Sequence, residues 1–88
     1  LDFNRPAIEG RLAQAAAYMG IEGGFDGFRA RVMELRTMLS IPAGLADLGV
    51  EEPQLDWLAA MAMEDPSVGG NPVKMTIENT RLLFSAAL

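Results

Sequence analysis

The sequence predicts an all-α protein, a compact bundle of about four to five short helices. Three observations support this fold class. Apolar residues recur at helical spacing in four segments, Gly and Pro clusters separate those segments, and no stretch alternates polar and apolar residues as a strand does. Because 88 residues make one small domain at most, we expect residues 1–88 to form a single helical segment.

The first predicted helix runs from about Arg5 to Met19. Pro6 fits its first turn, where the N–H that proline lacks would have no partner inside the helix. One face carries apolar residues at helical spacing: Ile8, Leu12, Ala15 and Met19. The glycine-rich stretch GIEGG, residues 20–24, then ends the helix.

The second predicted helix begins near Phe25 or Asp26 and ends near Leu39. It carries the clearest amphipathic stripe of the chain, which is made by Phe25, Phe28, Val32, Leu35 and Leu39. Pro42 prevents the helix from continuing. In the connector that follows, we expect one short helical turn at Ala43–Asp47, with Gly49 as its cap.

Two more helices are predicted in the second half. The third starts near Glu51–Pro53, since acids and proline favour a helix N-terminus, and continues to Met63. Its apolar positions include Leu55, Leu58, Ala59 and Ala62. The fourth runs from Thr76, a good N-cap, to Leu88, with a mixed stripe of Ile77, Arg81, Phe84 and Leu88.

Composition excludes several kinds of site. The chain has no Cys and no His, so it offers no disulfide, no thiolate nucleophile and no histidine base or metal ligand. Its net charge is −5, and Lys74 is the only lysine beside six scattered arginines, which argues against a nucleic-acid partner. No apolar run approaches the length of a membrane span. We therefore expect no catalytic, metal-binding or cofactor-binding residue, and no enzyme activity, in this chain alone.

The segment MEDPSVGGNP, residues 63–72, is the one stretch that invites a functional reading. Glu64 and Asp65 are adjacent acids, and we expect them to pair with Lys74 or with the following helix N-terminus rather than to bind a cation. Gly69 and Gly70 match no phosphate-binding motif and are typical of a turn. Ser67 has no base beside it apart from a remote possibility at Lys74.

The order of motifs from Leu39 to Leu88 resembles the C-terminus of the iron-dependent (iron-containing) alcohol dehydrogenases. No single motif is specific, but their order and spacing together are, and the opening LDFN also fits. The matching motifs are Ile41-Pro42, Leu45 to Val50, Leu55 to Ala59, Asp65, Asn71-Pro72, Thr76 and Ala87-Leu88. The sequence departs from the family pattern at Val73, where many members have Arg, and at Asn79, where an acid is common.

The resemblance implies a two-domain enzyme of the dehydroquinate-synthase-like type. An N-terminal α/β domain would bind NAD(P), and a C-terminal helical domain would hold iron, sometimes zinc, through one Asp and three His that all lie upstream of Leu1. The reaction would be hydride transfer between an alcohol and nicotinamide. In the family the loop at Ser67 approaches the substrate side of the cleft, so Ser67 and Val68 are substrate-pocket candidates.

We accordingly expect a C-terminal fragment of an NAD(P)-linked alcohol dehydrogenase, a scaffold with one pocket loop that is inactive alone. Its partner would be the missing N-terminal and metal-bearing part of the same enzyme, in a cytoplasmic homo-oligomer, and a first residue Leu rather than Met fits an excised piece. The alternative is a free-standing all-α interaction module that binds a partner through its apolar surfaces, since 50% of the residues are hydrophobic and six are methionine. An acyl-carrier or DNA-binding bundle finds no supporting motif.

Overall fold

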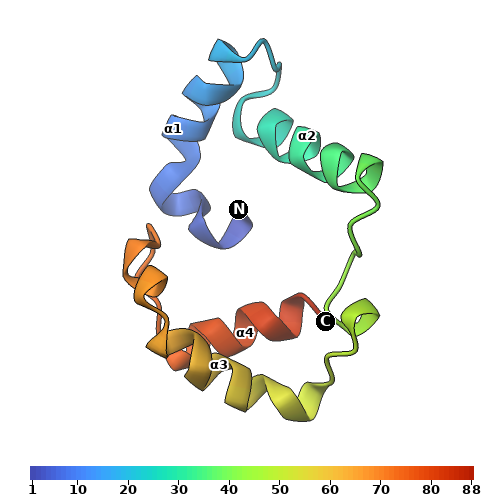
Figure 1. The fold of residues 1–88 in the computed structure, drawn as a ribbon. Helices are drawn as coiled ribbons and strands as arrows, with labels where there is room; N and C mark the ends of the chain where they lie inside the picture. Colours follow the sequence, from blue (N-terminus) through green and yellow to red (C-terminus); the bar gives the residue numbers. More distant parts are fainter. The chain divides into compact units, whose positions relative to one another are not determined.

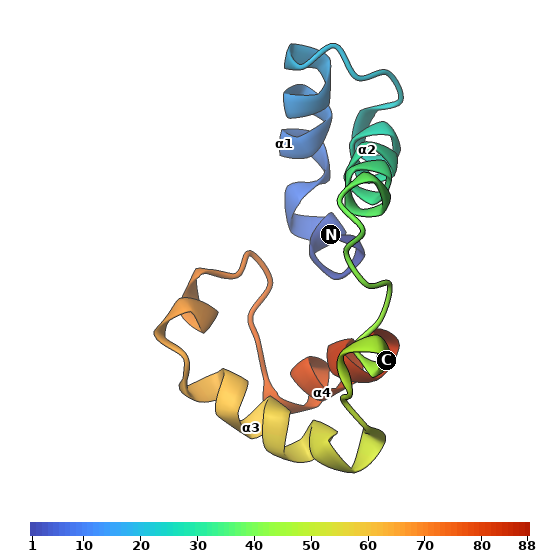
Figure 2. The same cartoon turned by 45° about the vertical axis from the view of Figure 1, so that its right-hand side comes forward.

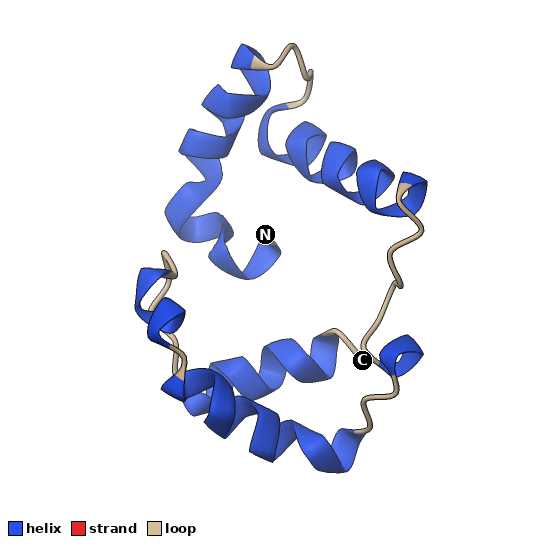
Figure 3. Cartoon of the chain, in the orientation of Figure 1, coloured by secondary structure: helices blue, strands red, loops and turns tan.

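The computed structural model describes residues 1–88 and contains helices and loops only, as Figure 3 shows, so the predicted all-α class is confirmed. The chain divides into two compact units, Leu1–Ile41 and Pro42–Leu88, which are described separately. The first contains η1 (Asp2–Asn4), α1 (Arg5–Tyr18) and α2 (Gly24–Met38). The second contains η2 (Ala46–Leu48), η3 (Glu52–Gln54), α3 (Leu55–Glu64), η4 (Pro66–Gly70) and α4 (Ile77–Ala86), where α denotes an α-helix and η a 3₁₀-helix. No helix has both the length and the apolar character needed to cross a membrane.

In the first unit, α1 and α2 pack side by side as a helical hairpin (Figures 1 and 2). Ala16 of α1 and Phe25 of α2 are its buried residues. The Arg5 guanidinium lies 4.5 Å from the centre of the Phe25 ring and pairs with Glu9 and Asp26, at 2.6 and 3.0 Å. One arginine therefore covers the buried aromatic ring and links the two helices by charge.

The two helices of this hairpin end in the same way. At the end of α1, the N–H of Ile21 donates to the carbonyl of Ala16 at 2.8 Å, and Gly20 between them has a φ of 73°. At the end of α2, the N–H of Ile41 donates to the carbonyl of Arg36 at 3.0 Å, and Ser40 has a φ of 55°. Both ends are Schellman motifs, in which a left-handed residue lets the chain satisfy the last carbonyls. In α2 that position carries a serine, the chain's one non-glycine residue with positive φ.

The apolar stripe predicted for α2 is buried at its start and open at its end. Phe25 is 3% exposed, whereas Leu35 and Leu39 are 46% and 61% exposed. Val32, between them, is 37% exposed. The hairpin therefore covers the first turns of the stripe, and the last turns face outward from this unit.

The connector in the second unit differs from the prediction. The expected turn at Ala43–Asp47 is instead η2 at Ala46–Leu48, because the residues before it lie against the C-terminal end of α4. The N–H of Leu45 donates to the carbonyl of Ala87 at 2.7 Å, and a Cβ on Gly44 would approach the carbonyl of Leu88 to 2.6 Å. The chain is therefore too close to α4 there for any residue larger than glycine. Gly49, with a φ of 83°, ends the turn as predicted.

The core of the second unit lies between α3 and α4. Leu55 and Ala59 of α3 are fully buried, and Thr80 of α4 is 5% exposed. The Thr80 hydroxyl is 3.6 Å from the sulfur of Met63 and donates to it, so this buried polar group has a partner. Small side chains at Ala59 and Thr80 suit the close packing of the two helices. The predicted N-cap Thr76 is confirmed, since its hydroxyl accepts from the N–H of Asn79 at 3.2 Å.

Candidate functional site

The loop between α3 and α4 is ordered by hydrogen bonds of its own. α3 ends at Glu64, and η4 begins at Pro66. Proline suits this first position, because the N–H of a residue there has no acceptor within the helix and its loss costs nothing. The carboxylate of Asp65 accepts from the N–H of Ser67 at 2.7 Å, and the Asp65 carbonyl accepts from the N–H of Val68 at 3.1 Å. The loop therefore begins as a capped turn with a fixed backbone, not as a free linker.

This arrangement corrects the expected partner of Asp65. The prediction paired Glu64 and Asp65 with Lys74 or with the N-terminus of α4, but the ion pairs of the structure involve none of these three side chains. Asp65 caps η4 instead. The Ser67 backbone N–H, and then its hydroxyl, favour the charged carboxylate and lower the pKa of Asp65. The sequence contains a signal for this cap, since Asp followed by Pro is a common start of a helical turn.

The end of the loop is held by two asparagines. Asn71 donates from Nδ2 to the carbonyl of Val73 at 2.6 Å and to the sulfur of Met75 at 3.3 Å. Asn79 accepts at Oδ1 from the N–H of Thr76 at 2.8 Å and donates from Nδ2 to the carbonyl of Lys74 at 3.0 Å. An acid at position 79 could accept the first bond but, when charged, could not donate the second. The departure at Asn79 thus adds a hydrogen bond to the loop.

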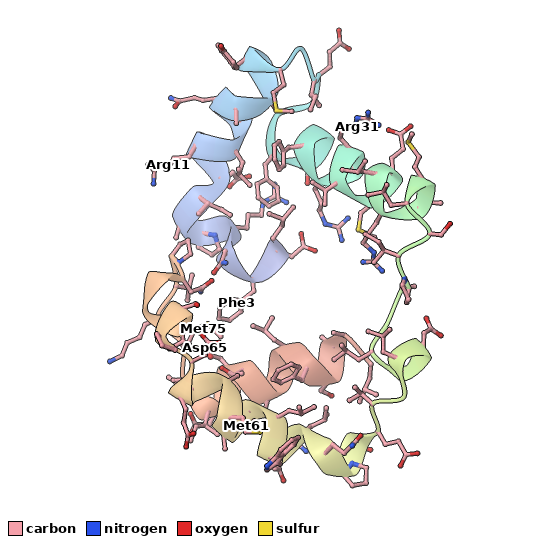
Figure 4. The ribbon with its side chains drawn as sticks, viewed as in Figure 1. Phe3, Arg11, Arg31, Met61, Asp65 and Met75 are labelled. Carbon is pink, nitrogen blue, oxygen red and sulfur yellow. The ribbon has the colours of Figure 1, made fainter.

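Two hollows border this loop, and both lie within the second unit. The first, of about 340 Å³, is lined by Ala62, Asp65, Ser67, Val68, Asn71 and Met75. The second, of about 410 Å³, is lined by Val68, Gly69, Asn71, Pro72, Lys74 and Met75. Figure 4 shows the labelled Asp65 and Met75 near one another beside the loop, consistent with their place in the first hollow. The first hollow combines apolar walls with carboxylate, hydroxyl and amide groups, the mixture typical of small-molecule sites.

The two predicted pocket residues occupy different positions in this site. Ser67 is exposed and lines the first hollow, and Val68 is half-buried and lines both. Lys74 lines the second hollow only, whereas the carboxylate beside Ser67 is that of Asp65, which accepts from the Ser67 N–H and hydroxyl. Sequence reasoning missed Asn71 and Met75, which line both hollows.

The described residues do not fit a metal ion. No three acidic side chains come together as ligands, and the chain has no histidine or cysteine.

Comparison with known proteins relates the whole chain to one protein family. The model of one protein family, described as "Fe-containing alcohol dehydrogenase family, C-terminal", matches residues 1–88. Alcohol dehydrogenase 4 of Schizosaccharomyces pombe (strain 972) is 30% identical over 84 residues, which cover 94% of this chain and 20% of the relative. The chain thus spans about a fifth of the length of this curated relative. No solved structure matches the chain.

Proposed function

Since the chain belongs to the iron-containing alcohol dehydrogenase family and matches its C-terminal part, we propose that it is the C-terminal fragment of an NAD(P)-linked alcohol dehydrogenase. The resemblance stated from the motifs is thereby confirmed at the level of the family. The observation that carries the proposal is the match over residues 1–88, from the first residue to the last.

In this proposal the chain contributes scaffold and one wall of the substrate pocket. Its residues form one segment of the helical domain, and the iron and the dinucleotide bind to parts of the enzyme outside these 88 residues. The absence of histidine and of a ligand cluster supports that division of labour. When bound, the metal would act as a Lewis acid on the alcohol oxygen and the nicotinamide would exchange the hydride. The fragment alone would not turn over substrate.

The loop from Asp65 to Asn71 is the part that we place beside the substrate, with Ser67 and Val68 as pocket residues. Support comes from the first hollow, where Val68 supplies an apolar wall and the exposed Ser67 supplies a hydroxyl. The capped turn keeps both residues at fixed positions relative to α3. A hydroxyl on a rigid loop is well suited to hydrogen-bond a polar group of a small ligand.

The partner of the exposed apolar surfaces, in this proposal, is the remainder of the same enzyme in a cytoplasmic homo-oligomer. The apolar stripe of α2 supports this partner. Its last residues, Leu35 and Leu39, remain 46% and 61% exposed, although they continue the face that is buried at Phe25. Trp57 and Met61 of α3 are likewise 60% and 50% exposed. Fifteen large apolar side chains are exposed in these 88 residues, and exposed apolar surface of that extent marks contact with a partner or with another part of the same protein.

The experiment is an activity assay on the full-length enzyme that carries this chain. The purified protein, loaded with iron, is expected to reduce NAD or NADP in the presence of primary alcohols, while the 88-residue chain shows no turnover under the same conditions. Metal removal by a chelator should abolish the activity, and re-addition of iron should restore it. A full-length protein that oxidises no alcohol with either nicotinamide would overturn the proposal. An open reading frame that encodes only these residues would favour the interaction module instead.

A further inference from the structure

One side chain of α4, that of Asn79, binds the last residues of the connection between α3 and α4. The carbonyl of Lys74 accepts from Nδ2 of Asn79 at 3.0 Å, and the N–H of Thr76 donates to Oδ1 at 2.8 Å. We propose that Asn79 is a positioning residue, which holds the substrate-side loop in place although it lines neither hollow. This inference rests on the proposed alcohol dehydrogenase function and adds a residue to it.

Asn79 is itself held firmly by the helix to which it belongs. It lies in the first turn of α4, where its own N–H donates to the hydroxyl of Thr76 at 3.2 Å, and it is half-buried. The next residue, Thr80, is buried and donates to the sulfur of Met63 on α3. The core of the second unit therefore fixes the point from which the Asn79 side chain projects.

A second set of hydrogen bonds connects this anchor to the loop. Asn71, the last residue of the loop, donates from Nδ2 to the carbonyl of Val73 at 2.6 Å and to the sulfur of Met75 at 3.3 Å. Met75 lies between the two peptide groups that Asn79 binds. The first turn of the loop is closed by the Asp65 cap. Both ends of the loop that carries the two pocket candidates are thus held, the second of them through Asn79.

The chemistry of asparagine allows this hold to be removed without loss of the helix start. An amide accepts at its oxygen and donates at its nitrogen, whereas an ionised carboxylate accepts only. In Asn79→Asp, the bond from the Thr76 N–H would remain, and an acid in the first turn of a helix is favoured by the helix dipole. The Lys74 carbonyl would lose its donor and would face a negatively charged oxygen instead. The change therefore releases the loop end selectively.

The first part of the test is cleavage of the full-length enzyme by a lysine-specific protease. Lys74 is the only lysine among these 88 residues, and the carbonyl that the protease attacks is the one that Asn79 binds. Cleavage requires the segment to open, and the fragment that begins at Met75 is followed by mass spectrometry. Asn79→Asp is expected to speed its appearance about two- to tenfold, the range that the loss of one hydrogen bond gives. The control Gln14→Glu makes the same change from amide to acid at an exposed residue of α1 and should leave the rate unchanged.

The second part separates a positioning role from a merely structural one. In the same metal-loaded proteins, kcat and KM are measured with the best substrate among the primary alcohols from ethanol to octan-1-ol. A displaced binding loop weakens ground state and transition state alike, so Asn79→Asp is expected to raise KM about two- to tenfold at unchanged kcat. Damage to α4 would instead reduce the number of active molecules, which lowers kcat at unchanged KM. Where Asn79→Asp does not accumulate as folded enzyme, Asn79→Glu removes the same donor and keeps a capping-box acid.

The two measurements distinguish failure of the inference from failure of the proposed function. Cleavage after Lys74 at the wild-type rate in the acidic variant overturns the hold that Asn79 is proposed to exert. Faster cleavage with an unchanged KM overturns its role at the substrate-side loop, while turnover by the wild type still establishes the dehydrogenase. A wild type that oxidises none of these alcohols overturns the proposed function, and with it the role of Asn79 in that function.

Discussion

Replacement of Ser40 by glycine is expected to stabilise the helical hairpin of the first unit. Ser40 occupies the left-handed position of the Schellman motif that ends α2, with a φ of 55°. Gly20 occupies the same position at the end of α1, with a φ of 73°. The hairpin therefore contains its own reference, the same backbone motif with and without a side chain.

The magnitude follows from two opposing terms. An L-residue in the left-handed region costs roughly 1–2 kcal/mol, and this cost disappears in Ser40→Gly. Glycine loses more backbone freedom on folding, which costs about 0.5–1 kcal/mol. The net gain is about 0.5–1 kcal/mol in the free energy of unfolding. The reverse change, Gly20→Ser, should cost a similar amount, because a Cβ at Gly20 would meet no atom within 4 Å and the effect is conformational alone.

The assay is thermal unfolding followed by circular dichroism, at one fixed protein concentration so that any association contributes equally. For a chain of this size, 1 kcal/mol corresponds to a shift in Tm of about 4–8 °C. Ser40→Gly is therefore expected to raise Tm by about 2–8 °C and Gly20→Ser to lower it by a similar amount. If Ser40→Gly lowered Tm, the serine side chain would have to stabilise this helix end by more than the left-handed conformation costs, and the reasoning would be wrong.

Three further predictions concern the second unit. Leu55→Ala should lower the free energy of unfolding by about 2–5 kcal/mol in denaturant titrations, because Leu55 is fully buried, whereas Leu82→Ala, at a site 67% exposed, should change it little. Equal effects of the two changes would place the core elsewhere. Gly44→Ala should also destabilise the unit, by roughly 1–3 kcal/mol as in other overpacked sites, since its Cβ would press on the Leu88 carbonyl, while Gly69→Ala meets nothing within 4 Å and serves as the control. Lastly, the pKa of Asp65 is lowered in the folded chain, so its bond to Ser67 contributes stability above the unfolded value of about 3.9 and loses it as pH falls through the folded value. The amide proton of Ser67, followed by NMR, should titrate with a midpoint below that value and stop doing so in Asp65→Asn; a midpoint at or above it would contradict the capping role.

The helices could be predicted from the sequence because their signals are local. The Thr76 cap depends on residues within one helical turn, and the Gly20 break depends on the conformational freedom of a single residue. The 3₁₀-turn at Ala46–Leu48 was misplaced for the opposite reason. Its position depends on Gly44 lying against the end of α4, a contact between residues more than forty positions apart in the chain. Periodicity contains no information about such a contact.

In the candidate site, too, local features could be predicted from the sequence and features that depend on distant contacts could not. Ser67 and Val68 were placed on a loop by sequence, and the loop turns out to line two hollows. The lining roles of Asn71 and Met75 could not be predicted, since they depend on how the chain returns from η4 to α4. The cap that Asp65 provides could be predicted from the sequence, because Asp-Pro-Ser has the residue types of a capped turn. This bond is local, since it joins residues two positions apart in the chain.

The position of Lys74 has a practical consequence for work on the isolated chain. It is the only lysine among the 88 residues, its side chain is exposed, and it lines the second hollow. An amine-reactive fluorophore would therefore have one side-chain attachment point, with the terminal α-amine as the only competing amine. The dye would lie at the rim of the hollow, where its emission would respond to water entering or leaving. A single conjugation reaction thus gives an optical reporter of the loop without the introduction of a cysteine.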